Sequence, residues 1–147
     1  MAKGGRFNPI GVPALYLALT MEGLFLEMAH GFAHRFEPLT VCAYDVDVDD
    51  IVDLRTDAKR KSAGVDFADM ARAWELDVSN GIEPAARRIA KDLIAKQSAG
   101  ILVPSFAKGA SSHMHNLVLW NWGPRLPHRV IVHDPGGRLP KDQRSWR

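Results

Sequence analysis

The chain has 147 residues, of which 46% are hydrophobic and 24% charged, and this composition indicates one globular domain with a core of its own. Its 19 basic and 17 acidic residues leave a net charge of +2, which excludes the strongly basic surface that binds nucleic acid or a membrane. The only cysteine, Cys42, excludes an internal disulfide, and with no signal-peptide core and no membrane-spanning run we expect a cytoplasmic protein.

The N-terminal segment predicts a loop followed by a strand. Residues 4–11 contain two adjacent glycines, an arginine whose planar fork suits phosphate or carboxylate, and an Asn-Pro turn. The glycines allow the backbone to approach a ligand closely or to take positive φ. The apolar run 14–19 then predicts a buried strand that carries Tyr16. Together these features indicate an anion-binding cleft without identifying the anion.

A helix is predicted over 21–34, with Thr20 as its N-cap. Its apolar stripe consists of Met21, Leu24, Phe25, Met28 and Phe32. Glu27, His30 and His34 share another face and have the spacing of a metal site, although the glutamate that follows the first histidine in zinc proteases is missing. We expect no metal, and a metallohydrolase built on these three residues stays an alternative beside an ordinary solvated face.

The middle of the chain predicts a strand over 39–48 that contains Cys42 as a buried thiol, and a short extended piece over 51–54. Residues 56–64 carry three consecutive basic side chains and are expected to form a solvated loop. Asp66 has the character of an N-cap and begins a helix that ends near Leu76.

The C-terminal half predicts one more helix and three strands. The helix starts with Pro84 as its first residue and runs to about residue 97, with Gly100 as its stop. Strands follow over 101–103, 117–120 and 129–132, and the tail 134–147 is expected to be irregular. Because helices and strands do not alternate as βαβ units, we expect one α+β domain, with flanking helices on a mixed or mostly antiparallel sheet and a core over about 4–133.

The residues alone leave several functions open. Arg6, Tyr16 and Glu27 could share one cleft, but a surface arginine, a core tyrosine and a solvated glutamate would give the same pattern. Ser105 follows a predicted strand without the Gly-x-Ser-x-Gly sequence of a nucleophile elbow. A Ser-His-Asp hydrolase using His113 or His115 therefore stays possible but has no specific spacing in its favour.

At these same residues the chain resembles the RES domain, a family named for an arginine, a glutamate and a serine that match Arg6, Glu27 and Ser105. The resemblance covers most of the chain, and its first block is the most specific part. The matching segments are Gly-Gly-Arg-Phe-Asn-Pro-Ile-Gly at 4–11, Leu-Tyr-Leu-Ala at 15–18, Glu27, Gly-Ile-Leu-Val-Pro-Ser at 100–105 and Asn-Leu-Val-Leu at 116–119.

The resemblance implies a toxin of a bacterial toxin–antitoxin module, paired with an Xre-type antitoxin, with a fold similar to that of ADP-ribosyltransferases. Its substrate would be NAD, which such proteins either use to modify a protein with ADP-ribose, as in the ParT type, or destroy by hydrolysis or phosphorolysis. A binding module that holds a nucleotide or an antitoxin without turnover is the alternative. The family normally has an upstream segment that brings another arginine to the pocket, whereas this chain begins almost at the glycine pair. This difference slightly favours the binding module.

The resemblance also implies roles for individual residues. Glu27 would stabilise the positive charge that develops on the ribose, and Arg6 would bind the pyrophosphate. Tyr16 would pack against the nicotinamide or its ribose, so these three residues form the expected catalytic group. Ser105 would donate a hydrogen bond to a phosphate or ribose oxygen, and Phe7, where the family usually has tryptophan, would complete the NAD-binding set.

Overall fold

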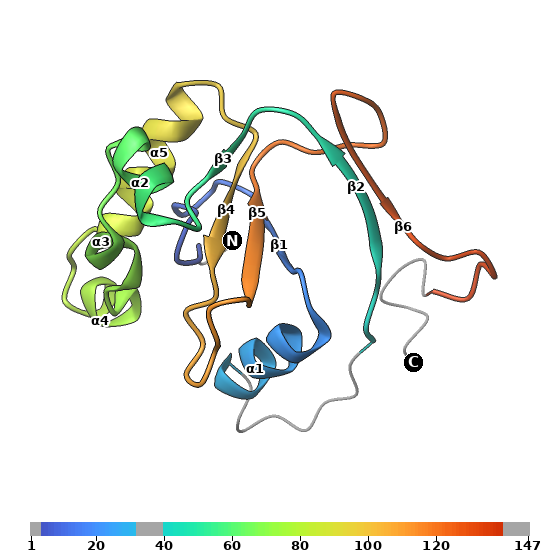
Figure 1. The fold of residues 1–147 in the computed structure, drawn as a ribbon, viewed down its shortest axis with the longest axis horizontal. Helices are drawn as coiled ribbons and strands as arrows, with labels where there is room; N and C mark the ends of the chain where they lie inside the picture. Colours follow the sequence, from blue (N-terminus) through green and yellow to red (C-terminus); the bar gives the residue numbers. More distant parts are fainter. Residues whose placement is uncertain (1–3, 32–39, 140–147) are drawn as a thin grey trace.

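A four-stranded sheet forms the centre of the molecule in the computed structural model, which describes residues 4–31 and 40–139 (Figure 1). The strand order is β1-β5-β4-β3, in which β5 runs antiparallel to both neighbours and β3 runs parallel to β4. The strands are β1 (Leu15–Ala18), β3 (Ile51–Asp53), β4 (Gly100–Pro104) and β5 (His115–Leu119). The predicted mixed sheet and α+β class are confirmed.

A separate antiparallel ribbon consists of β2 (Tyr44–Val48) and β6 (His128–Val132), at the right of Figure 1. The predicted strand over 39–48 is too long: β2 begins at Tyr44, which pairs with Val132, the last residue of β6, and residues 40–43 are not part of a strand. Residue 39 lies outside the described residues. Cys42 consequently lies before β2 and is half-buried, so its expected burial within a strand is wrong.

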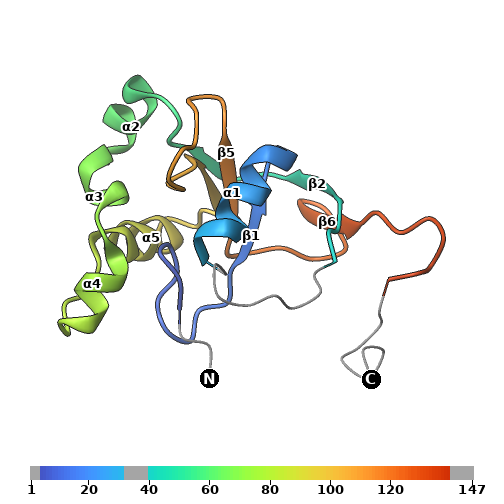
Figure 2. The ribbon, with the colours of Figure 1, turned by 90° about the horizontal axis from the view of Figure 1, so that it is seen from below.

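Five helices surround the sheet in the described part of the chain. In Figure 1 α2 to α5 gather on the side of β3 and β4, whereas α1 lies apart from them near β1, and Figure 2 shows the same separation of α1 from the other four helices. None of the helices within 4–31 and 40–139 is long and apolar enough to cross a membrane. Their bounds are α1 (Met21–Gly31), α2 (Asp57–Ala63), α3 (Phe67–Ala71), α4 (Trp74–Ser79) and α5 (Ala85–Ala95).

The charged segment predicted as a loop over 56–64 is a helix, α2. Thr56 caps its first turn by accepting a hydrogen bond from a backbone N–H, and Gly64 ends it with φ of 69°. Arg60 is buried and donates to the carbonyl of Leu54, so the basic run is not wholly solvated. Capping at both ends therefore decides the structure of a segment that has no apolar stripe.

The helix predicted from Asp66 to Leu76 is two helices, because Arg72 takes an extended conformation with ψ of 148° between α3 and α4. Two boundaries of α5 also differ from prediction. Pro84, with ψ of 139°, precedes the helix rather than opening it, and Gln97, with φ of 68°, follows its last turn. Gly100 does not stop the helix but starts β4, where a Cβ atom would lie only 2.3 Å from a β5 carbonyl oxygen.

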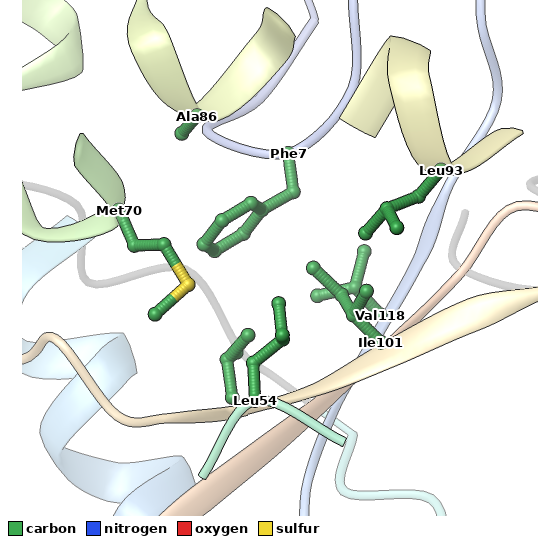
Figure 3. Close-up of a cluster of buried hydrophobic side chains, with 8 residues drawn as sticks. Phe7, Leu54, Met70, Ala86, Leu93, Ile101 and Val118 are labelled. Atoms are coloured by element: carbon green, nitrogen blue, oxygen red, sulfur yellow. The ribbon is translucent and has the colours of Figure 1, made fainter. Parts of the chain in front are cut away.

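The core lies between the sheet and helices α3 and α5. Figure 3 shows Phe7, from the N-terminal loop, between α3, α5 and the sheet, and Phe7 is only 2% exposed. The loop that precedes β1 is therefore anchored in the core rather than lying on the surface. The buried cluster consists of Phe7, Leu54, Met70, Ala86, Leu93, Ile101, Val103 and Val118.

Strand β1 is less buried than its apolar sequence predicts. It lies at the edge of the sheet and pairs only with β5 among the described strands. Its Tyr16 is 45% exposed, and Leu15, Leu17 and Ala18 are half-buried. At the other end of the chain, residues 134–139 form turns without regular structure, and the rest of the predicted tail lies outside the described residues.

Candidate functional site

A cavity of about 620 Å³ opens between the N-terminal loop, α1, α4 and the sheet. Its volume falls within the range of about 300–1,000 Å³ that is typical of small-molecule sites. Arg6, Tyr16 and Glu27 all line it, so the structure brings together the three side chains that the residue pattern left open and that the resemblance implied for one site. Three further wall residues, Trp74, Phe106 and Asn116, were not singled out as site residues.

Glu27 lies on the inward side of α1, and its carboxylate has a fixed orientation. The same oxygen, Oε1, accepts a hydrogen bond from Ser105 Oγ at 2.7 Å and from Asn116 Nδ2 at 2.6 Å. The described residues donate no hydrogen bond to Oε2. One carboxylate oxygen is thus bound by the protein, and the other is left for a ligand in the cavity.

The apolar stripe of α1 is only partly buried. Met21 and Phe25 are 53% and 54% exposed and Leu24 and Met28 are half-buried, while Gly23 is buried and Glu27, one turn later, is half-buried. The interpretation of Glu27 as an ordinary solvated residue is therefore wrong. The helical wheel did not show this because the buried side of α1 includes Gly23 and Glu27 beside part of the apolar stripe.

The two donors to Glu27 come from neighbouring strands. Ser105 directly follows β4, and its backbone N–H donates to the carbonyl of Met114, which fixes it in place. Asn116 lies on β5, between partners on β4 and β1. Its amide nitrogen must face the carboxylate, since the amide oxygen would be repelled there. The sequence signal for Asn116 is a polar side chain inside an otherwise apolar strand.

The Arg6 guanidinium is also held by the protein. Its Nη1 donates to the carbonyls of Met70 and Arg72 at 2.9 and 2.8 Å, and its Cζ lies 4.9 Å from the centre of the Phe106 ring. Burial lowers the pKa of Arg6, and the nearby carboxylates, Glu27 first, partly oppose that shift. Arginine stays charged at neutral pH, and its Nε and Nη2 donate to none of the described residues. They can therefore bind an anion.

Tyr16 connects the cavity wall to the N-terminal loop. Its ring is partly exposed, but its hydroxyl accepts from Phe7 N at 3.0 Å and donates to Asn8 Oδ1 at 2.7 Å. Burial of the hydroxyl raises the pKa of Tyr16 to about 12, so the phenol stays neutral near neutral pH. A Cβ atom on Gly5 would lie 2.6 Å from this hydroxyl, while Gly4 takes φ of 72°. The glycine pair therefore lets the loop close onto Tyr16.

Phe7, expected to bind NAD, is primarily a core residue. Its ring is almost fully buried but contributes one part of the cavity wall. Its backbone is fixed from both sides, because Trp120 Nε1 donates to its carbonyl at 2.7 Å and Tyr16 accepts from its N–H. The fixed backbone of Phe7 thus helps to fix the backbone position of its neighbour Arg6.

The alternative chemistries find little support in the described residues. Glu27 is bound to Ser105 and Asn116, while His34 and the side chain of His30 lie outside the part of the chain that is described. Within residues 4–31 and 40–139, no three His, Cys, Asp or Glu residues are placed to bind a metal. The Ser105 hydroxyl donates to Glu27, and His113 bonds to Ser111 instead, so Ser105 has no histidine partner among the described residues.

A comparison with known protein families gives one match, to the RES domain, over residues 1–142. No curated protein and no solved structure matches the chain. The matched region contains every described residue of the cavity wall, including the arginine, glutamate and serine that line it or support it. By a match that spans nearly its whole length, the chain belongs to the RES domain family.

Proposed function

We propose that the protein is an NAD-consuming enzyme that breaks the bond between nicotinamide and ribose and transfers ADP-ribose to an acceptor. The observation that carries this proposal is the carboxylate of Glu27, fixed through Oε1 by Ser105 and Asn116 while it lines the same cavity as Arg6. The Glu27 carboxylate can stabilise a developing positive charge, and the Arg6 guanidinium can bind a pyrophosphate.

The reaction makes modest demands on proton transfer. When the C1′–N bond breaks, its electron pair leaves with nicotinamide, which departs as a neutral molecule and needs no proton. The ribose becomes an oxocarbenium-like centre, as in glycoside cleavage. An oriented carboxylate stabilises that charge without reorganising, and it can accept a hydrogen bond from a ribose hydroxyl at its free oxygen. An acceptor oxygen or nitrogen then bonds to C1′ and releases its proton.

Arg6 is suited to the other end of the substrate. Its Nη1 is already used by two backbone carbonyls, which fixes the plane of the guanidinium and leaves the remaining donors for phosphate oxygens. The Tyr16 ring lines the space between loop and helix, where it can pack against the nicotinamide or its ribose. In this arrangement Ser105 acts mainly through Glu27, because its hydroxyl is already donated to that carboxylate.

We further propose that the protein acts as a toxin, of which an Xre-type antitoxin is the partner that blocks the cavity. Membership of the RES domain family supports this proposal. The acceptor of ADP-ribose is either a protein, as in the ParT type, or water or phosphate. Mass spectrometry of lysate proteins after incubation with NAD distinguishes these outcomes, since only the first leaves ADP-ribose on a protein. Relief of growth arrest by co-expressed antitoxin tests the partner.

The test of the enzyme is nicotinamide release by purified protein, with Glu27→Gln as the variant. The amide keeps the size of the side chain and an oxygen that can accept from Ser105 and Asn116, but it loses the charge. We expect the rate to fall by about 100- to 1,000-fold, with NAD affinity nearly unchanged. Glu22→Gln is the matched control, because Glu22 is exposed on the same helix.

Two results would contradict the proposal. A folded Glu27→Gln variant with wild-type turnover would place the catalytic carboxylate elsewhere. If the wild-type protein binds NAD but releases no nicotinamide, the protein is a binding module and not an enzyme.

A further inference from the structure

Arg87 is a buried arginine beneath the N-terminal loop that no feature of the proposed reaction uses. It lies on α5, is 6% exposed, and forms no ion pair with any carboxylate of the described residues. A buried guanidinium without a carboxylate partner is unfavourable for folding, and an apolar side chain of similar volume would usually stabilise such a position better. The presence of a charge there therefore requires another explanation.

Arg87 contacts the backbone next to Arg6. Its Nε donates to the carbonyl of Gly5 at 2.9 Å, and this carbonyl belongs to the peptide group that directly precedes Arg6. Its Cζ lies 5.4 Å from the centre of the Trp74 ring, and Trp74 lines the cavity. A Cβ atom on Gly4 would lie 3.1 Å from Arg87 Nη2, so the loop packs directly onto the guanidinium.

The Arg87 guanidinium also has a donor that the described residues do not use. Its Nη2 is buried and has no hydrogen-bond partner among the described residues. Arg6, on the other side of Gly5, likewise forms no ion pair within the described ranges, although Glu27 and Glu75 lie near enough to act on its charge. Two guanidinium groups therefore flank one short stretch of backbone, and the free donors of Arg6 can bind an anionic ligand.

We infer that Arg87 is a positioning residue, which fixes the Gly5 carbonyl and thereby sets the direction of Arg6 toward an anionic, pyrophosphate-bearing substrate. The expected effect on NAD kinetics rests on the proposed function, whereas the expected effect on the loop does not. Arg87 itself does not line the cavity described above, so it acts through the loop rather than by contact with substrate.

The test uses Arg87→Met, which keeps much of the side-chain length but removes the charge and the donors, and Arg87→Lys, which keeps the charge and one donor group. Arg88→Met is the matched control, because Arg88 is the next residue of α5 and is exposed. Hydrogen exchange of the Gly5 and Phe7 amides reports on the loop. Steady-state NAD kinetics and titration with ADP-ribose report on binding.

For Arg87→Met we expect the loop amides to exchange about tenfold faster or more, while the amides of β4 and β5 keep their protection. The KM for NAD and the Kd for ADP-ribose should rise about tenfold or more, the ratio expected for one charge-assisted contact, with a smaller change in kcat. Arg87→Lys should be less affected in all three measurements, and the Arg88→Met control should behave as wild type.

Wild-type loop exchange and wild-type KM in folded Arg87→Met would overturn the inference. Equal loss of protection in β4 and β5 would also overturn it, because Arg87 would then support the core in general. If Arg87→Met does not fold, Arg87→Gln takes its place with the same expected outcomes. Should the wild-type protein fail to bind or cleave NAD, the proposed function falls, while loop exchange still decides whether Arg87 positions the loop.

Discussion

Replacing Asn116 by aspartate would place a second carboxylate against Glu27 with almost no change in side-chain size. In the wild-type protein the Asn116 amide donates to Glu27 Oε1 at 2.6 Å, so the substitution converts an attraction into a repulsion. With charge centres about 4 Å apart and an effective dielectric constant of about 20, the repulsion is about 4 kcal/mol. This corresponds to about three pKa units, so the two carboxylates would share a proton near neutral pH.

The assay is the pH dependence of nicotinamide release. If ionised Glu27 is required, the acid limb of the profile for Asn116→Asp should move upward by about two to three pH units, with activity recovering on the alkaline side. The unfolding free energy should also depend on the interaction between these two carboxylates. The shared proton raises a folded-state pKa above its unfolded value, so the deficit in unfolding free energy relative to wild type is smallest at low pH and grows as pH rises through that raised pKa.

Asn121→Asp is the control for this experiment, because Asn121 is exposed and bonds to His128 rather than to a carboxylate. It should leave the acid limb of the profile in place. An Asn116→Asp variant with an unshifted acid limb and a stability deficit independent of pH would refute the reasoning. The Asn116 side chain would then not contact Glu27 in solution.

Three further substitutions test the surroundings of the site. Arg6→Lys keeps the charge but loses the planar fork, so the Kd for NAD measured by calorimetric titration should rise about tenfold or more, and an unchanged Kd would contradict the role of Arg6. Tyr16→Phe leaves the Phe7 N–H without its acceptor and should lower the unfolding free energy in urea by about 1–3 kcal/mol. Because the Tyr16 pKa is raised to about 12, the wild-type protein should also lose stability as pH rises from about 10 toward that value, a component that the variant lacks. Gly100→Ala, whose Cβ would meet a β5 carbonyl at 2.3 Å, should cost about 1–3 kcal/mol in the same assay, whereas Gly123→Ala has open space and should cost less.

Local sequence patterns were sufficient to predict most strands and the amphipathic helix α5. The α5 stripe succeeds because its apolar residues, such as Ala86 and Leu93, are the ones that pack against the core. Prediction failed where a short segment depends on its ends or on a distant partner. Helix α2 has no apolar stripe and depends on Thr56 and Gly64 as caps, and the start of β2 depends on where β6 ends.

The candidate site was predictable only in part, for a related reason. Arg6, Tyr16 and Glu27 lie in the N-terminal segment and were connected by the resemblance, but the pattern of α1 indicated that Glu27 was solvated. Asn116 and Arg87 interact with residues 89 and 82 positions away in the sequence, and no local periodicity encodes such contacts. Both carry the same weak signal, a polar side chain on an otherwise buried face.

The break between α3 and α4 shows how a departure from regular structure serves the site. A continuous helix over this segment would bind the carbonyls of Met70 and Arg72 within its own hydrogen-bond ladder. Because the helix stops at Ala71, both carbonyls are left to accept from Arg6. The restart at Trp74 then places an aromatic ring between the cavity and the guanidinium of Arg87. The break thus goes against the local preference for one continuous helix and provides partners for Arg6 and Arg87. Departures of this kind from local preference are expected at functional sites.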